Sequence, residues 1–165
     1  MRSETASDLE EGGAAVNDNL GYLLKHVHLR FDALARPALA AIGLAGREFA
    51  VLAALGVDAP LSQHEAARFL GIDRTTMVAL VDALEAKSLV ERKPAPDRRK
   101  NLVRLTPAGQ ELLERAQVVR ADVERRFLSP VSDADVSEFR RILRTLLASP
   151  SPDGELARPG REVPA

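Results

Sequence analysis

The stretch from Ser62 to Leu105 constrains the fold most, because two short helical patterns are followed at once by two β-like runs. It opens with Ser62-Gln63-His64-Glu65, which has the form of a capping box: the hydroxyl and the carboxylate satisfy backbone N–H groups at the start of a helix. Gly71 supplies a residue on which a tight turn between helices can be made. We therefore expect one helix to begin at Ser62 and to end at Gly71.

A second helix should follow directly, because Asp73 is suited to cap it. Its apolar side chains recur at i, i+3, i+4 and i+7 and must be buried. They are Met77, Leu80, Val81 and Leu84. The opposite face carries short side chains, namely Thr75, Ala79, Asp82 and Ala86. Such a face would let the helix lie deep in a DNA major groove, with its first turn nearest the base edges.

After Lys87 the pattern changes to two short β-like runs, 89–93 and 101–105, joined by a loop that contains two prolines. This pattern predicts a hairpin, or wing, with a solvated tip. Between Lys87 and Arg104 there are seven basic and two acidic residues, a net charge of +5 in a chain whose formal net charge is −1. Positive charge concentrated on one hairpin favours contact with DNA phosphates and with the minor groove.

The composition excludes several other classes of protein. With 165 residues, 45% of them hydrophobic, the chain is long enough for one domain with a real core. It has no cysteine, so disulfides, thiolate zinc sites, cysteine nucleophiles and thiol-based sensing are excluded. No apolar run is long enough to cross a bilayer and the acidic N-terminus is not a signal peptide, so we expect a cytoplasmic protein.

Further helical patterns flank this unit. They cover residues 19–41, 47–55, 107–127 and 132–148. In the first of them Pro37 should kink the helix or end its regular part, and Gly43 should close it. Thr106-Pro107 is a strong start signal for the third. Residues 1–18 are predicted to form a flexible acidic tail, and 149–165, with four prolines, a disordered one.

Three segments together resemble the multiple-antibiotic-resistance regulator (MarR) family of bacterial winged helix-turn-helix proteins. They are 61–63, 73–85 and 97–109, and the last, with its trailing Leu-Thr-Pro-Ala-Gly, is the most specific. The resemblance implies a mainly α fold with a two-stranded wing, covering roughly residues 20–147. It implies a single MarR-type domain over 19–148, in which a winged-helix DNA-binding lobe over 44–106 lies between dimerisation helices over 19–43 and 107–148.

In that family the terminal helices of two chains interlock in a two-fold dimer, so the resemblance implies a homodimer. Two recognition helices related by a dyad would meet successive major grooves roughly 34 Å apart, and the operator should be a pseudo-palindrome. The expected function is that of a sequence-specific transcriptional regulator, a repressor that a small aromatic acid-like ligand releases. A winged-helix module for protein–protein contact alone is the alternative. An enzyme is not expected, because no nucleophile, base or phosphate-binding glycine loop is clustered in the sequence.

The residues expected to contact DNA lie in the two short helices and at the wing tip: Ser62, Gln63, Arg74, Thr75, Thr76, Val78, Arg98, Arg99 and Lys100. The resemblance assigns a wing-tip arginine to the minor groove. We expect Arg99, steadied by Asp97, to take this role, with Arg98 and Lys100 on phosphates. Polar first turns and charged loops are also ordinary surface features. The family often has a hydroxyl residue near Val78 and a basic one near Ala79, so DNA shape should carry more of the specificity here.

Tyr22, His26 and Arg30 share one helical face and are the candidate ligand-binding residues. Relatives bind small aromatic acids in a cleft between the dimer helices and the DNA-binding lobe, and a surface or dimer-contact stripe is an equally good interpretation. No metal site is expected, because His26 and His28, at i and i+2, point about 200° apart, and His64-Glu65 lacks a second histidine. No cofactor is expected either.

Overall fold

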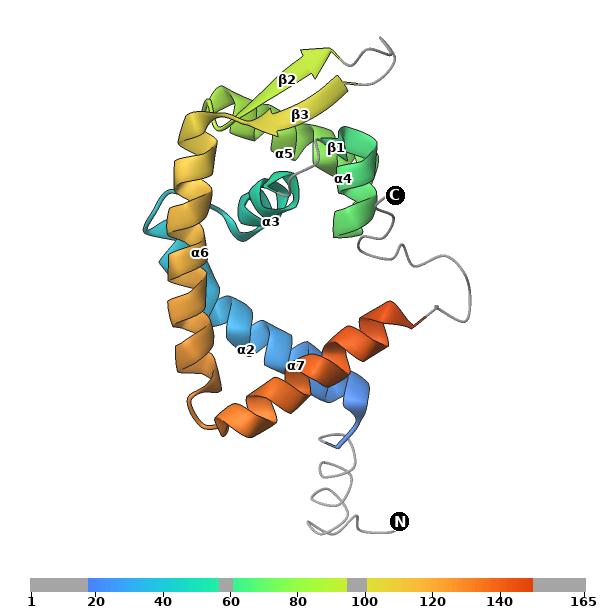
Figure 1. The fold of residues 1–165 in the computed structure, drawn as a ribbon, viewed down its shortest axis with the longest axis vertical. Helices are drawn as coiled ribbons and strands as arrows, with labels where there is room; N and C mark the ends of the chain where they lie inside the picture. Colours follow the sequence, from blue (N-terminus) through green and yellow to red (C-terminus); the bar gives the residue numbers. More distant parts are fainter. Residues whose placement is uncertain (1–17, 57–60, 95–100, 150–165) are drawn as a thin grey trace, which may run out of the picture.

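The computed structural model describes residues 18–56, 61–94 and 101–149 as a mainly helical chain with one small antiparallel sheet (Figure 1). The elements are α2 (Leu20–Ala40), α3 (Gly46–Leu55), β1 (Leu61–Ser62), α4 (Gln63–Leu70), α5 (Arg74–Ala86), β2 (Val90–Pro94), β3 (Asn101–Leu105), α6 (Pro107–Leu128) and α7 (Asp133–Ala148). Apart from Asp18 and Ser149, the predicted tails 1–18 and 149–165 lie outside the described residues.

The arrangement separates a lobe at one end of the molecule from two helices at the other. The sheet and α3, α4 and α5 form a lobe at one end of the molecule, α6 runs away from it along one side, and α2 and α7 occupy the other end (Figure 1). The expected mainly α fold with a winged helix-turn-helix is confirmed. In the described parts of the chain, no helix is both long and apolar enough to span a membrane.

The helices begin at the capping residues that the sequence indicates. The Ser62 hydroxyl accepts a hydrogen bond from the backbone N–H of Glu65 at 3.2 Å, and a Glu65 carboxylate oxygen accepts one from the backbone N–H of Ser62 at 2.8 Å. Asp73 caps α5 in the same way. Between these helices Gly71 adopts a φ of +64°, a left-handed conformation that ends α4 without steric penalty. The predicted helix-turn-helix is therefore confirmed.

Helix α2 contains Pro37 but continues to Ala40. The proline ring removes one backbone donor, and the helix ends within one turn of it, at a turn in which Gly43 has a φ of +76°. The helix therefore ends one residue before the predicted limit at Ala41, and Gly43 closes it as predicted.

The wing has one more strand than predicted. Strands β2 and β3 pair antiparallel, with Val90 opposite Leu105 and Arg92 opposite Val103, while β1 pairs with the other edge of β3. β1 places Leu61 opposite Val103. A two-residue strand has no periodicity that a sequence pattern can reveal. Its effect is to tie the start of α4 to the wing through the backbone.

The hydrophobic core lies in the lobe, where α3, α5, the strands and the first half of α6 meet. Its largest fully buried side chains are Leu39, Leu44, Val51, Leu52, Met77, Val81, Leu84, Val90 and Val103. The predicted apolar stripe of α5 is among them, apart from Leu80, which is half-buried. Because this stripe faces inward, the opposite side of α5 must face solvent.

Helix α6 begins directly against the base of the wing. The Thr106 hydroxyl donates to the carbonyl of Ser88 at 2.7 Å and accepts from the backbone N–H of Gly109 at 3.0 Å, while the Thr106 N–H donates to the carbonyl of Leu89 at 3.1 Å. A Cβ atom added to Gly109 would lie 1.9 Å from the Leu89 carbonyl oxygen. Glycine is required here because the two backbones approach too closely for any side chain.

Candidate DNA-binding site

The first turn of α5 presents two polar side chains to solvent. Arg74 and Thr75 are exposed, whereas Thr76 is half-buried. The Thr76 hydroxyl donates to an Asp73 carboxylate oxygen at 2.6 Å, and its backbone N–H donates to the other oxygen at 2.9 Å. These bonds from Thr76 lower the pKa of Asp73. Thr76 therefore helps to cap the helix, and its hydroxyl hydrogen is already in use.

The outward face of α5 is as predicted: Thr75, Ala79, Asp82 and Ala86 are all exposed. Val78 is half-buried at its flank. The small side chains leave room for close approach of a duplex along the N-terminal half of the helix. Direct contact of Val78 with DNA stays a prediction.

Ser62 and Gln63 are placed to organise the lobe. Ser62 is 8% exposed, and its hydroxyl donates to Glu65 at 2.6 Å. The Gln63 amide, with its oxygen turned toward Arg92, accepts from Nε at 3.0 Å and from Nη2 at 3.3 Å. Both side chains therefore bond within the protein. Their expected contacts with DNA stay predictions.

The base of the wing is less positive than the count of basic residues implies. Arg92 forms ion pairs with Asp82 and Glu85 of α5, and the bond to Asp82 raises the pKa of Arg92. Lys87 donates to both carboxylate oxygens of Glu48, at 2.7 and 2.9 Å. These pairs join two of the basic residues to carboxylates that lie outside the segment 87–104. Sequence patterns missed them because each joins residues from different elements.

The described part of the wing still carries one basic side chain without such a partner. Arg104 of β3 is exposed and forms no ion pair with any described residue, whereas Lys93 pairs with Glu91 of its own strand at 2.7 Å. Arg98, Arg99 and Lys100, together with Asp97, lie outside the described residues. Their roles at the wing tip therefore stay predictions.

The candidate ligand-binding residues on α2 form two groups. Tyr22 and His26 stack with ring centroids 3.8 Å apart, and His26 Nδ1 is 2.9 Å from the Tyr22 carbonyl oxygen, whereas Arg30 is exposed. None of the three lines the cavity of about 1190 Å³ between α2 and the lobe. That cavity is lined from α2 by residues including His28 and Asp32. The ligand role of Tyr22, His26 and Arg30 stays a prediction.

Arg120 of α6 also lines this cavity, between two phenyl rings. Its guanidinium carbon lies 4.6 Å from the ring centroid of Phe31 and 5.2 Å from that of Phe49. Burial lowers the pKa of Arg120, although Glu124 and Asp32 attract the charge from a distance. Arg120 forms no hydrogen bond or ion pair with any described residue. Arg120 cannot be recognised from the sequence, because it is one basic residue in an ordinary helical pattern.

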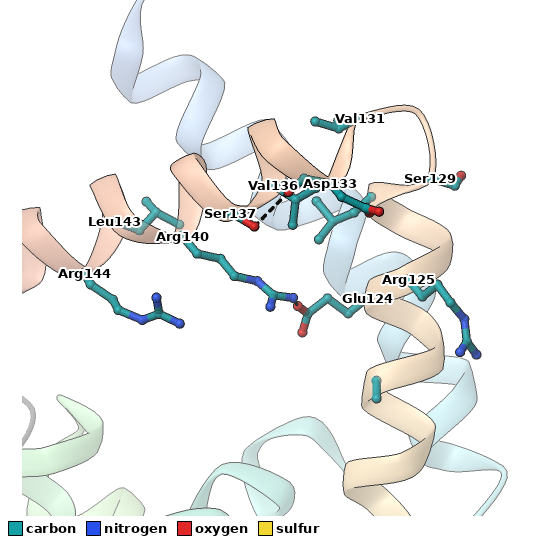
Figure 2. Close-up of a pocket in the computed structure, with 12 residues that line it drawn as sticks. Glu124, Arg125, Ser129, Val131, Asp133, Val136, Ser137, Arg140, Leu143 and Arg144 are labelled. Atoms are coloured by element: carbon teal, nitrogen blue, oxygen red, sulfur yellow. Dashed lines mark hydrogen bonds and ion pairs between the residues drawn. The ribbon is translucent and has the colours of Figure 1, made fainter.

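A second cavity, of about 950 Å³, lies between the end of α6 and α7. Figure 2 shows Arg140 of α7 reaching across it to Glu124 of α6, with which it forms an ion pair. Val136 and Leu143 contribute apolar surface from α7. Among the described residues, no three His, Asp or Glu side chains are grouped as a metal site would require.

A solvent-facing helix with a small-residue surface, set beside a wing on a helical lobe, defines a winged helix-turn-helix DNA-binding protein. The MarR family profile matches residues 42–100. A crystal structure of a MarR-family transcriptional regulator from Rhodococcus sp. RHA1 is 30% identical with a TM-score of 0.75, over 79% of this chain and 93% of that one. The chain belongs to the MarR family, whose members are transcriptional regulators and not enzymes.

Other similarities agree with this assignment. The transcriptional repressor NicR of Pseudomonas putida is 34% identical over 100 residues, which span 60% of this chain and 63% of NicR. A MarR variant from Escherichia coli complexed with operator DNA has a TM-score of 0.71 at 28% identity, over 78% of this chain and 93% of that one. CouR from Rhodococcus jostii bound to p-coumaroyl-CoA has a TM-score of 0.71 at 28% identity, over 79% and 93%.

Proposed function

We propose that two copies of this chain form a dimer that binds a pseudo-palindromic operator and represses transcription. The observation that carries this proposal is helix α7, in which no residue is buried although its apolar side chains recur at helical spacing. Phe139, Ile142, Leu146 and Leu147 are between 40% and 63% exposed. An apolar face of this kind is unfavourable in water unless another surface covers it.

Helix α2 also carries uncovered apolar side chains. Leu20, Leu23, Leu24 and Val27, which lie in its N-terminal half, are 40% to 66% exposed. α2 and α7 occupy the same end of the molecule (Figure 1), so one partner can cover both. A two-fold axis through this end would leave both winged lobes free and would orient two α5 helices toward one duplex. We place such a repressor in the cytoplasm.

On each half-site we assign Arg74 and Thr75 to direct contact with phosphates or base edges, and Val78 to apolar contact such as with thymine methyl groups. Ser62, Gln63 and Thr76 support the interface through the bonds described above. The wing-tip residues Arg98, Arg99 and Lys100 are assigned to the minor groove and its phosphates.

The test is a titration of the intergenic DNA upstream of the chain's own gene. We expect saturable binding of one dimer per site, with an affinity that falls steeply with salt because phosphate contacts release counterions. Arg74→Ala should weaken binding at least about tenfold, whereas Arg115→Ala, which removes an exposed arginine from α6, serves as the matched control. Binding no tighter than to shuffled DNA would instead support the protein–protein interaction module.

A response to a small organic acid is the second part of the proposal, and Arg120 is the observation that favours it. A half-buried cation between Phe31 and Phe49, facing a cavity, is well suited to hold a carboxylate whose apolar body lies against the cavity walls. The ligand bound to CouR, p-coumaroyl-CoA, supports an effector with an aromatic acyl group, but as a thioester it lacks the free carboxylate that we assign to Arg120. Release from the operator requires that the ligand bind the arrangement that is incompetent for DNA more tightly.

This part is tested with benzoate and 4-hydroxycinnamate, and with benzamide as the uncharged control. We expect the acids to raise the melting temperature and to weaken operator binding, and Arg120→Met to abolish both effects. Arg47→Met is the matched control, because Arg47 lines the same cavity and is exposed. If the acids and benzamide act alike, or if neither acts, the anion-binding role of Arg120 is excluded for these ligands.

A further inference from the structure

Three elements of the lobe meet at the side chain of Arg92. It starts from β2, pairs with Asp82 and Glu85 of α5, and in addition contacts the amide of Gln63 at the start of α4. Nε, Nη1 and Nη2 are therefore all used within the protein. An arginine whose planar group is held on several sides is fixed in position and has little capacity left for a phosphate.

The position of Arg92 along the wing gives this contact its importance. Arg92 lies two residues before Pro94, the last described residue ahead of the wing tip. The next basic residue of the strand, Lys93, pairs with Glu91 of the same strand and so does not tie the wing to a helix. The Arg92 cluster is thus the most distal ion pair between wing and recognition helix in the described part of the chain.

The charges at this cluster matter as well. Asp82 lies on the outward face of α5, and its side chain is 58% exposed; that of Glu85 is 40% exposed. Two carboxylates on a helix that approaches a polyanion would repel it. Arg92 places one positive charge between them, and its own side chain is 25% exposed. It therefore reduces the negative charge of the DNA-facing surface without projecting from it.

We propose that Arg92 is a positioning residue that locks the wing to the recognition helix, so that the wing tip and the first turn of α5 approach one duplex at a fixed separation. This inference rests on the proposed operator binding. Without the lock, the wing must be ordered when DNA binds, and the entropy lost at that step lowers the affinity. The DNA contact made by the wing should therefore be weakened, whereas the contact made by the N-terminus of α5 should be retained.

The chain offers a matched control on the neighbouring strand. Arg104 of β3 lies opposite Glu91 in the same sheet, is exposed, and forms no ion pair with any described residue. Arg92→Gln and Arg104→Gln therefore remove the same charge from the same sheet, but only the first breaks the link to α5. Neither side chain belongs to the buried core, so both variants should keep the fold, as circular dichroism can verify.

The experiment compares two footprints on the upstream operator. Hydroxyl-radical cleavage reports protection of the minor groove by the wing, and dimethyl sulfate reports protection of the major groove by α5. We expect Arg92→Gln to lose the wing protection while the α5 protection persists at saturating protein, with the operator Kd raised about tenfold or more. Arg104→Gln should weaken both protections together. If Arg92→Gln keeps the wild-type ratio of the two, the proposal is wrong.

A second variant breaks the lock from the helix side. Asp82→Asn with Glu85→Gln leaves Arg92 in place and removes two negative charges, so a purely electrostatic role predicts tighter binding with full wing protection. The lock predicts loss of wing protection in spite of the gain in charge, and faster amide exchange of β2 and β3 in the free protein. Wild-type protein without a footprint would overturn the proposed function instead, and amide exchange would still decide whether Arg92 holds the wing.

Discussion

Helices α5 and α7 carry the same kind of apolar stripe and have opposite environments. Met77, Val81 and Leu84 of α5 are at most 1% exposed, whereas Phe139 and Ile142 of α7 are at least 40% exposed. The periodic pattern shows that a face needs to be covered, and it does not show whether the same chain supplies the cover. In the lobe the chain covers its own stripe; at α7 we infer that a second copy does.

The largest effect is expected from a charge placed in the apolar stripe of α7. Ile142→Glu should raise the dimer dissociation constant at least about 100-fold, because an unpaired carboxylate would be buried at the interface. Sedimentation velocity and the operator titration measure the effect. The control is Ser137→Glu, an exposed position about 140° around the helix from Ile142, where the hydroxyl bonds only to the carbonyl of Asp133. A monomer–dimer balance equal in the two variants would contradict the inferred interface.

A substitution in the core of the lobe tests whether the chain covers its own apolar stripe there. Leu52 is 0% exposed within the cluster, so Leu52→Ala should lower the free energy of unfolding by about 2–5 kcal/mol. Urea denaturation followed by circular dichroism measures this loss, which should arise in the folded chain itself. If a higher protein concentration fully restored the free energy of unfolding of Leu52→Ala, dimerisation and not the core of the single chain would stabilise the lobe. That result would contradict the packing described above.

A smaller effect on the stability of the lobe is expected from the ion pair of Glu48 and Lys87. Glu48→Gln should lower the free energy of unfolding by about 1–2 kcal/mol at neutral pH, the screened value of a charged hydrogen bond, because the Lys87 side chain is 45% exposed. Burial raises the pKa of Glu48, but the bonds from the Ala45 N–H and from Lys87 together lower it below its usual value.

Because the pKa of Glu48 is lowered in the folded state, the effect of Glu48→Gln should depend on pH. A carboxyl whose pKa is lower in the folded state stabilises the protein above its unfolded pKa of about 4.3, and the contribution is lost as the pH falls through the folded pKa. The difference between wild type and Glu48→Gln should therefore be larger at neutral pH than at an acidic pH below the unfolded pKa. Denaturation at both pH values measures it; a difference that grew in acid would reverse the assigned direction.

The smallest effect is expected for an ion pair on α7. Arg141 bonds to Glu138 at 2.7 Å, but both side chains are more than half exposed. Arg141→Ala should leave the melting temperature unchanged within error, because solvent and salt screen such pairs. A clear loss of stability that persisted in high salt would show that the pair lies in an environment less exposed than this structure gives it, because buried pairs are screened much less.

Local signals made much of the fold predictable. Capping residues such as Ser62 and Asp73, and the glycine between them, act within a few positions of the chain, and the structure confirms each. The engagement of Arg92 with α5 and the rings around Arg120 were not predictable, because they join residues distant in sequence. The charge count over 87–104 includes Arg92 and Lys87, but their carboxylate partners Glu48, Asp82 and Glu85 lie outside that segment. The sequence identifies each basic residue, but only the packing of the folded chain shows whether a carboxylate is paired with it.

Because Gly109 packs directly against the Leu89 carbonyl, the start of α6 and the base of the wing are joined rigidly and should move together. The 22 residues of α6 span about 33 Å. A rotation of about 5° at the far end would thus carry the wing base through about 3 Å, close to the ~3.4 Å step between stacked base pairs. A small rearrangement of the helices at the far end of α6 is therefore enough to displace the wing along the DNA by about one base pair.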